Sequence, residues 1–553
     1  RAERAVAAQA GEQPAKSPDA AVWAGYDRGP MLLRRIAGAG LAPDRAPTRA
    51  VWSAAPASDW TSEACALVRA ARTRADAGVL VVVPDARDVE ALLGRLEPER
   101  AAGLVAVLTA DAGPERRYRE FVRVLRGGAR VVVGTRAAVF APVADLRLLV
   151  IGDDGNDALA DPQAPYWDAR DVAALRSHLT GCDLVVGAPA RSVAAQQWCA
   201  TGWARSVEPS RATVAERRPR VRAIAAEDAA RDPAAAAARI PHTAWQAARA
   251  GLVDGPILVQ VARRGYLPVL SCQRCREPAR CVACGGPLAL GATGSVPACS
   301  WCGHVAADWA CPHCQGRRLR AVEVGAERTA EEVGRAFPGV PVLASHGGHM
   351  VGRVSAAPQV VVATPGAEPD CDGGYRAVLL LDARAQLARV GLDAVMDVTR
   401  RWFAAARLGA PGARVVVTAP NASPAVQALL RWDATWLAER ELAERAAAGL
   451  PPATRAAVLL GSDADIRAVA AALELPHRLL GPVAVEPVAV GPTAAGPGQA
   501  RAAGPEQARA VVVVDRALGA DLARQLRAIT ATRSARGGSP RARVHIHLDP
   551  RDL

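Results

Sequence analysis

The chain has 553 residues, half of them hydrophobic, which is enough for three or four domains of about 100 to 200 residues each. No apolar run reaches the about 18 residues needed to span a bilayer, so the composition excludes a membrane protein and predicts a soluble one. A net charge of +13, from 68 Lys and Arg against 55 Asp and Glu, favours a polyanionic partner such as nucleic acid, although an Arg-rich coding bias would give the same charge.

The first part of the chain has the pattern of an α/β lobe. Residues 1–50 are rich in Ala, Arg and Pro without clear periodicity, and we expect an N-terminal remnant or linker there. Between 51 and 204, continuous Val and Leu runs alternate with helical stretches, which is typical of parallel strands covered by helices on both faces. The expected strands are 78–85, 103–110, 129–135, 146–154 and 182–190.

The second part repeats this pattern and ends in a smaller domain. A polar, Arg- and Ala-rich stretch at 205–240 predicts a linker. Residues 241–448 then predict a second α/β lobe, and 449–553 predict a small α+β domain with strands at 509–515 and 541–549. The strands expected in the second lobe are 255–262, 358–364, 375–383 and 412–419.

Eight of the twelve cysteines form four CxxC pairs in a segment, 268–320, that is inserted into the second lobe. Each pair supplies two thiolates from one turn, so four pairs complete two tetrahedral structural sites and predict two Zn²⁺ ions per chain. Disulfides are the alternative, but they belong to short secreted chains, whereas free thiols and zinc indicate a reducing cytoplasm. Spacing alone allows adjacent or nested pairs to share an ion. The pairs are Cys272/Cys275, Cys281/Cys284, Cys299/Cys302 and Cys311/Cys314.

Two consecutive α/β lobes suggest the nucleotide-clamping halves of an ATP-driven translocase. Such a protein needs a phosphate-binding loop ending in Gly-Lys-Ser/Thr, because the lysine neutralises the β- and γ-phosphates. The only lysine is Lys16, outside either predicted sheet. The sequence therefore excludes a standard Walker A motif.

The cysteine-rich segment and its surroundings resemble one family. The stretch ARRGYLPVLSCQRCREPARCVACGGPLAL at 262–290, followed by CSWCGH and CPHCQG, is similar to the cysteine-rich region of the PriA family of replication restart helicases. Further similar stretches are VVVGTRAAVFAPVADLRLLVIGDD at 131–154 and VHIHLDPRDL at the end of the chain. The resemblance covers nearly all of residues 50–553.

The resemblance implies a fold, two metal sites and partners. The fold is α/β: two RecA-like lobes, a two-zinc insertion in the second lobe and a small α+β C-terminal domain. Nested zinc sites are implied, with one ion on Cys272, Cys275, Cys311 and Cys314 and the other on Cys281, Cys284, Cys299 and Cys302. The implied partners are branched DNA with single-strand/duplex junctions, the replicative helicase and the single-strand binding protein, in a cytoplasmic, nucleoid-associated setting.

Four parts of the family's ATP machinery are altered. The loop at 54–61 reads AAPASDWT, without the family's glycines and lysine. The acidic motif at 153–156 reads DDGN, where one acid remains but the last residue cannot ionise. The motif at 187–190 reads GAPA, and Arg407 falls out of register with the family's arginine finger. The family's N-terminal 3′-end-binding domain and winged helix are also not recognisable before residue 50.

Five residues are candidate DNA contacts. Arg136 follows a predicted strand in a turn that resembles the family's strand-gripping motif, and Tyr166 and Trp167 resemble its aromatic loop. Arg263 and Arg264 precede the first cysteine pair. Arginine can pair with phosphate and aromatic rings can stack on bases.

We therefore predict a replication restart protein that binds stalled or abandoned forks and promotes primosome assembly and reloading of the replicative helicase. Because the motifs above are altered, we expect it to have no ATPase or helicase activity of its own. The alternative is an active 3′–5′ DNA helicase with an unorthodox nucleotide site in which Arg replaces Lys, since Arg binds phosphate bidentately. A zinc-ribbon interaction module unrelated to replication is a third interpretation.

Overall fold

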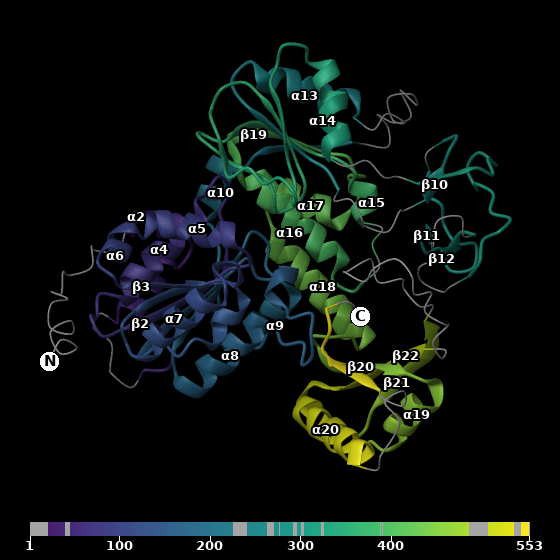
Figure 1. The fold of residues 1–553 in the computed structure, drawn as a ribbon. Helices are drawn as coiled ribbons and strands as arrows, with labels where there is room; N and C mark the ends of the chain where they lie inside the picture. The colour runs from purple at the N-terminus through teal and green to yellow at the C-terminus, as the bar shows by residue number, and fades with distance from the viewer. Residues whose placement is uncertain are drawn as a thin grey trace.

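The computed structural model describes residues 20–38, 45–224, 240–262, 270–275, 277–290, 296–299, 304–321, 326–387, 389, 391–485, 507–535, 544–551 and 553. Two lobes, each built on a parallel sheet, are followed by an antiparallel C-terminal domain (Figure 1). The predicted α/β architecture of two RecA-like lobes with a cysteine-rich insertion and an α+β C-terminal domain is confirmed.

The first lobe contains a seven-stranded sheet in which all strands run parallel. Its central strands are buried along their whole length, as continuous Val and Leu runs require when helices cover both faces. In order across the sheet, the strands are β3 (Val105–Leu108), β4 (Val131–Gly134), β2 (Gly78–Val82), β5 (Leu146–Gly152), β6 (Asp183–Ala188), β1 (Arg49–Ser53) and β7 (Arg205–Val207).

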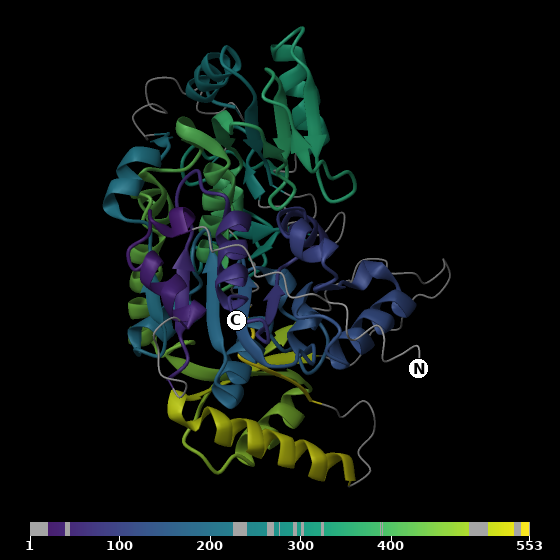
Figure 2. The ribbon, with the colours of Figure 1, turned by 90° about the vertical axis from the view of Figure 1, so that its left-hand side faces the viewer.

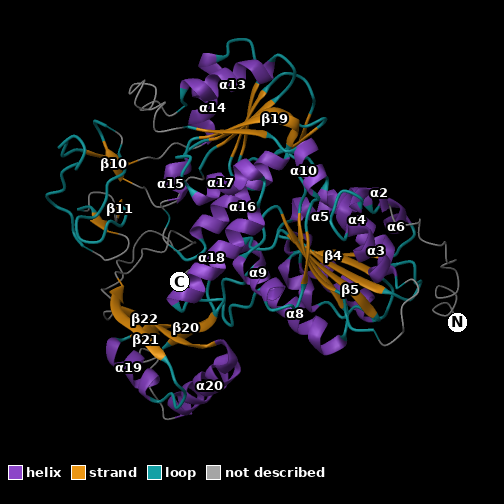
Figure 3. Cartoon of the chain, turned by 180° about the vertical axis from the view of Figure 1, so that it is seen from behind, coloured by secondary structure: helices purple, strands orange, loops and turns teal. Residues whose placement is uncertain are grey.

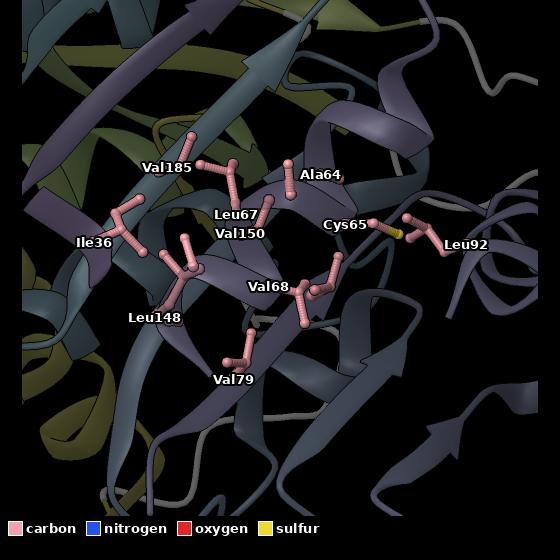
Figure 4. Close-up of a cluster of buried hydrophobic side chains, with 14 of the residues drawn as sticks. Ile36, Ala64, Cys65, Leu67, Val68, Val79, Leu92, Leu148, Val150 and Val185 are labelled. Carbon is pink, nitrogen blue, oxygen red and sulfur yellow. The ribbon is translucent and has the colours of Figure 1, made fainter. Parts of the chain in front are cut away.

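Helices pack on both faces of this sheet. One face carries α3, α4 and α5, whose apolar side chains meet those of β2, β5 and β6 in the core that Figure 4 shows. The other face carries α7, η2 and α8. The helices are α2 (Ala20–Trp23), α3 (Gly29–Ala37), α4 (Trp60–Ala71), α5 (Ala86–Arg95), α6 (Glu97–Ala101), η1 (Ala110–Ala112), α7 (Pro114–Leu125), η2 (Arg136–Phe140), η3 (Asp157–Leu159), α8 (Ala169–Thr180), α9 (Val193–Ala200) and α10 (Arg211–Arg217).

Two expected boundaries differ from the structure. Residues 20–37, which we expected to be a remnant or linker, pack into the first core because Trp23, Tyr26 and Ile36 are buried there. The expected linker at 205–240 contributes β7 to the first sheet and β8 (Arg220–Ala223) to the second. We therefore propose that the first domain includes residues 20–37 and that the connection between the lobes is shorter than 205–240.

The second lobe contains a six-stranded parallel sheet. Its order is β14 (Val342–Ser345), β16 (Val360–Ala363), β9 (Ile257–Gln260), β18 (Tyr375–Leu380), β19 (Gly409–Val417) and β8; the short strands β15 (Arg353–Val354) and β17 (Asp370–Cys371) pair beside it. The helices are α13 (His242–Leu252), α14 (Ala326–Ala336), α15 (Ala383–Leu387), α16 (Ala394–Arg407), α17 (Pro424–Arg431) and α18 (Ala434–Ala448). The helix α16 faces the first lobe, and its residues from 394 to 406 are mostly buried.

The cysteine-rich insertion and the C-terminal domain lie at the periphery (Figure 3). The insertion has two short antiparallel strand pairs, β10 (Leu270–Cys272) with β13 (Leu319–Ala321) and β11 (Leu288–Ala289) with β12 (Ala298–Cys299). The C-terminal sheet has the order β21 (Arg478–Val485), β22 (Gln507–Asp515), β20 (Thr454–Gly461), β23 (His545–Leu548), with α19 (Asp463–Ala471), η4 (Arg516–Leu518) and α20 (Gly519–Ala535). Figure 2 shows this domain at the end of the molecule opposite the second sheet.

No helix in the described ranges combines the length and the apolar character needed to cross a bilayer.

Candidate functional site

The loop between β1 and α4 lies at the carboxyl end of a strand that pairs in parallel on both sides, with β6 and β7, and a strand-to-helix loop of this kind is where a phosphate-binding loop would lie. Backbone amides of such a loop are the donors that hold phosphate. Here Ala54 donates its amide to the carbonyl oxygen of Ala188 at 3.0 Å. The amide of Ala55 donates to the hydroxyl oxygen of Tyr26 at 2.8 Å. Both amides are therefore bonded within the protein, and Lys16 lies outside the described residues.

Asp59 occupies the amino terminus of α4, where a phosphate would interact with the helix dipole. Its carboxylate accepts hydrogen bonds from the amides of Thr61 and Ser62 at 3.0 and 3.4 Å. It also pairs with Arg95. Burial raises the pKa of Asp59, but the bonds from Thr61 and Ser62 and the charge of Arg95 outweigh burial and lower the pKa below its ordinary value. An internal anion thus caps this helix.

The buried carboxyl of Glu63 stabilises the loop at 54–61 through hydrogen bonds. Tyr26 donates its hydroxyl hydrogen to Oε1 of Glu63 at 2.5 Å, and Ser58 donates to Oε2 at 3.4 Å. Glu63 is only 2% exposed, and this burial raises its pKa from 4.5 to about 8. Burial also raises the pKa of Tyr26 above its ordinary value. The loop is therefore fixed by the N-terminal segment that carries Tyr26.

Asp154 lies in the acidic stretch at 153–156, and both of its carboxylate oxygens are engaged by protein groups. Its side chain is 1% exposed. One carboxylate oxygen accepts from the Arg170 guanidinium at 3.3 Å, and the other accepts from the Ser192 amide at 3.0 Å. A buried carboxylate held in this way supports the fold around β5 and β6.

Asp153 contacts the second lobe. It lies in the left-handed backbone region, with φ of 55°, and its Oδ2 accepts from Nη1 of Arg400 at 2.6 Å. The same oxygen accepts from Nδ2 of Asn156 at 2.6 Å. The side chain of Arg400, on α16, is 9% exposed. A largely buried ion pair therefore joins the two lobes.

Two further arginines of α16 reach the first lobe. Nη2 of Arg401 lies 3.4 Å from a carboxylate oxygen of Asp157. Nη1 of Arg407 donates to the carbonyl oxygen of Ser58 at 2.8 Å, in the altered loop itself. Arg407, expected to be out of register as an arginine finger, thus points at the loop and bonds to its backbone.

A cavity of about 280 Å³ lies between these groups, with walls from both lobes. Trp60 lines it together with six carboxylates and four guanidinium groups. An excess of acids disfavours a polyanion in a confined space. The charged residues are Asp85, Arg87, Asp88, Asp153, Asp157, Glu368, Asp370, Arg400, Arg401 and Arg407.

The first cysteine cluster joins the ends of the insertion. The sulfur atoms of Cys272, Cys275, Cys311 and Cys314 all lie within 4.8 Å of one another. The Sγ atoms of Cys272 and Cys314 are 3.5 Å apart, as are those of Cys275 and Cys311. A Cβ atom on Gly316 would lie 3.2 and 3.3 Å from two of these sulfurs, so glycine keeps the cluster open. Four thiolates so placed can hold one soft metal ion.

The second cluster is formed by the inner pairs. The sulfurs of Cys281, Cys284 and Cys299 lie within 4.8 Å of one another, and those of Cys284 and Cys299 are 3.4 Å apart. The amide of Gly286 points at the Cys284 sulfur at 3.4 Å. Cys302 lies outside the described residues. Both groupings have the nested arrangement, and each cluster can hold a metal ion.

The predicted DNA contacts are dispersed. Arg136 lies 3.4 Å from the carboxylate of Asp161 and is partly exposed. Arg263 and Arg264 fall outside the described residues. The roles of these three arginines stay predictions.

The aromatic pair at 166–167 touches two different neighbours. Tyr166 stacks on His547 of β23, with ring centroids 4.3 Å apart. Trp167 meets Phe140 edge to face at 4.8 Å. Tyr166 and Trp167 are half-buried, so the first lobe uses part of this loop to hold the C-terminal domain.

The C-terminal contact and the inter-lobe pairs were not foreseen from the sequence. Arg551 pairs with Asp168, next to the Tyr166 stack. No local sequence pattern predicts a contact between residues that are hundreds of positions apart in the chain. Tyr26 could have been singled out from the sequence as a candidate structural residue, because aromatic residues make up only 4% of the chain.

Comparison with solved structures found distant resemblances. Saccharomyces cerevisiae Dbp5 bound to RNA and ADP BeF3 has a TM-score of 0.41 and 10% identity, covering 79% of this chain and 96% of that one. RecG bound to a three-way DNA junction has a TM-score of 0.35 and 9% identity, covering 74% of this chain and 45% of that one.

Sequence comparison gave much stronger matches. Residues 446–551 match the family model described as the primosomal protein N C-terminal domain. The probable replication restart protein PriA of Mycobacterium tuberculosis is 44% identical over 572 residues, covering all of this chain and 84% of that protein. The replication restart protein PriA of Bacillus subtilis is 22% identical over 265 residues, covering 48% and 33%. This chain therefore belongs to the PriA family of replication restart proteins.

Proposed function

We propose that this protein binds stalled or abandoned replication forks and promotes primosome assembly and reloading of the replicative helicase, without ATPase or helicase activity of its own. The main support is the state of the loop at 54–61. The amides of Ala54, Ala55 and Thr61 donate to Ala188, Tyr26 and Asp59, respectively. A triphosphate would have to displace an ionised carboxylate that Arg95 also holds.

The inter-lobe arginines give a second line of support. In ATP-driven enzymes of this kind an arginine stabilises the charge on the transferred phosphoryl group. Here Arg400 and Arg401 bind the carboxylates of Asp153 and Asp157. The carboxylates of Asp153 and Asp157 thus supply the negative charge that these two arginines bind, and the ion pairs hold the lobes together.

The cysteine clusters are proposed to hold two Zn²⁺ ions, with Cys302 as the fourth ligand of the second ion. Tetrathiolate sites of this type are structural, because all four coordination positions belong to the protein. The zinc-braced insertion would then offer a rigid docking surface. Proposed partners are forked DNA, the replicative helicase and the single-strand binding protein, with the protein in the cytoplasm at the nucleoid.

Fork binding can be tested directly. Fluorescence anisotropy should show that the protein prefers a three-strand fork to a duplex of equal length. Affinity should fall steeply as salt rises from 50 to 200 mM, because Arg contacts release counterions from phosphate. Equal affinity for fork and duplex would contradict the proposed role.

The second candidate, an active helicase with an unorthodox nucleotide site, is favoured by one observation. The 280 Å³ cavity between the lobes is lined by arginines of both, and arginine can bind phosphate bidentately. A strand-separation assay on the same fork with ATP and Mg²⁺ distinguishes the two candidates, since only the helicase separates the strands.

A further inference from the structure

One face of the first lobe exposes large apolar side chains. Among residues 45–224, every exposed large hydrophobic residue lies on α7, η2 or α8, the elements that cover the same face of the first sheet. Both α7 and α8 pack on this face through the same core cluster (Figure 1). Concentrated apolar exposure of this kind marks an interaction site. The residues are Tyr118, Phe121, Leu125, Phe140, Leu175 and Leu179.

The helix α7 carries three of them in a single stripe. Tyr118, Phe121 and Leu125 are spaced three and four residues apart, so they point to the same side of the helix. They are 71%, 39% and 60% exposed, respectively. Val124 is the one fully buried side chain of this twelve-residue helix. The fold does not need the two aromatic rings for its core.

The stripe has a strongly positive border. The segment from 115 to 126 carries five arginines against two glutamates. Arg119 and Arg123 pair with Glu115 and Glu120 at 2.7 and 3.2 Å, which neutralises both acids.

Two arginines beside the stripe remain available. Arg117 and Arg126 are exposed, and no ion pair or hydrogen bond to their side chains occurs within the described part of the chain. By helical geometry, at about 100° per residue, Arg117 flanks the stripe on one side and Arg126 on the other.

We propose that this α7 surface, formed by Arg117, Tyr118, Phe121, Leu125 and Arg126, binds single-stranded DNA. Exposed rings stack on unpaired bases, and flanking arginines pair with the phosphates on either side. Bases in a duplex are already stacked, so the two rings select unpaired strands. The choice of DNA as the nucleic acid rests on the proposed function.

The length of the stripe sets the size of the site. Seven residues separate Tyr118 from Leu125, which is about 10 Å along a helix. Two aromatic platforms in that distance accommodate two or three bases, as in other stacking surfaces of about this size. The surface lies away from the inter-lobe cavity, so it can hold a single strand whether or not a nucleotide binds.

A matched pair of variants tests the proposal in the full chain. The first is the double variant Tyr118→Ser with Phe121→Ser, and the second is Leu175→Ser with Leu179→Ser on α8. Leu175 and Leu179 are also exposed, at 56% and 72%. On α8, however, Arg170 and Arg176 are both bonded within the protein.

Binding is measured by anisotropy with a labelled 12-nucleotide oligo-dT. The α7 aromatic variant should bind at least tenfold more weakly, because two stacking contacts are lost. The α8 variant should bind like the unmodified protein. A third variant, Arg117→Gln with Arg126→Gln, should reduce the slope of log affinity against log salt by about 1.4, at about 0.7 per phosphate contact for single strands.

The outcomes separate this proposal from the proposed function. If the unmodified protein binds forks but both α7 variants match it in oligo-dT affinity and salt slope, the proposal is wrong and fork binding stands. If the aromatic variant keeps its oligo-dT affinity but loses self-association in sedimentation velocity, the surface serves protein contacts and the proposal is overturned. Circular dichroism of each variant controls for folding.

Discussion

Asp59 shows at the residue scale how a phosphate site can be closed without losing the helix behind it. The amino terminus of α4 still attracts an anion, as any helix does. The anion is now a side chain that is covalently part of the loop and accepts from Thr61 and Ser62. A tethered carboxylate competes with a free phosphate at very high effective concentration.

Replacing Asp59 should loosen the first turn of α4. We expect Asp59→Ala to cost about 1 kcal/mol of local stability, the usual value for a lost N-cap. The amides of Thr61 and Ser62 should then exchange about fivefold faster in hydrogen-exchange mass spectrometry. Asn is an equally good cap, so Asp59→Asn should exchange near the original rate. Unchanged exchange in the Ala variant would contradict the capping role.

Glu63 should make stability depend on pH. Its folded pKa of about 8 lies above the ordinary 4.5, so the folded state binds the proton more tightly. The free energy of unfolding therefore falls as pH rises from about 4.5 to about 8, by up to about 1.4 kcal/mol per pH unit. Below pH 4.5 the Glu63 carboxyl is protonated in both the folded and the unfolded state, so its titration no longer lowers the free energy of unfolding.

The Glu63→Gln variant isolates this effect, because its amide oxygen can still accept from the Tyr26 hydroxyl. Thermal unfolding at pH 5, 6.5 and 8 should show the variant gaining stability over the unmodified protein as pH rises. If the difference in melting temperature between the variant and the unmodified protein stays constant from pH 5 to pH 8, the pKa of Glu63 is not raised.

At the scale of elements, α16 links the lobes through Arg400, Arg401 and Arg407. Removing one partner of a buried ion pair costs roughly 3–5 kcal/mol, because the remaining charge is left without compensation. The Arg400→Met variant should therefore open the lobes, and small-angle X-ray scattering should report a larger radius of gyration. Arg249→Met, on the exposed side of α13, is the control and should leave it unchanged.

The triple variant at Arg400, Arg401 and Arg407 sharpens this test. It should scatter as an open molecule, and added ATP with Mg²⁺ should not close it. If the triple variant keeps the original radius of gyration, other contacts hold the lobes and the arginines do not.

The two cysteine clusters give a prediction about metal content. In the nested arrangement, Cys272→Ser with Cys314→Ser removes two ligands from one ion, and the chain should retain about one zinc per molecule by mass spectrometry of metals. Adjacent pairing would place these cysteines on different ions, and the same variant would lose both. Cys281→Ser with Cys299→Ser should give the reciprocal loss.

The sequence predicted those elements whose physics is local. The buried strands β2, β4, β5 and β6 were recognisable because a strand covered on both faces needs a continuous apolar run. The edge strand β8 has an alternating half-exposed pattern and looked like part of a linker. β1 was missed because RAVWS has only three apolar residues, between an Arg and a Ser.

The parts of the site formed at long range were not predictable in this way. The single lysine, Lys16, indicated that a standard phosphate-binding loop is absent. It did not indicate which protein group takes the place of the phosphate. Asp153 and Arg400 are 247 residues apart, and their pairing follows from how the lobes pack. The CxxC pairs are the opposite case, since each turn carries its own metal ligands.

At the scale of the whole molecule, the C-terminal domain rests on the first lobe through Tyr166 with His547 and Asp168 with Arg551. Asp154 connects to this contact through Arg170, which lies beside Asp171 and Asp168. Asp154 is thus linked, through Arg170, to the interface that positions a neighbouring domain. This use of the acid suits the rigid fork-binding body that we propose.

The most direct test of the account is the rate of ATP hydrolysis by the zinc-loaded protein, measured at saturating forked DNA with binding followed in the same sample. We predict full occupancy of the fork and no hydrolysis above the rate of a heat-inactivated control. Fork-stimulated turnover of ATP at one per second or faster, within the ordinary range for enzymes, would contradict the account.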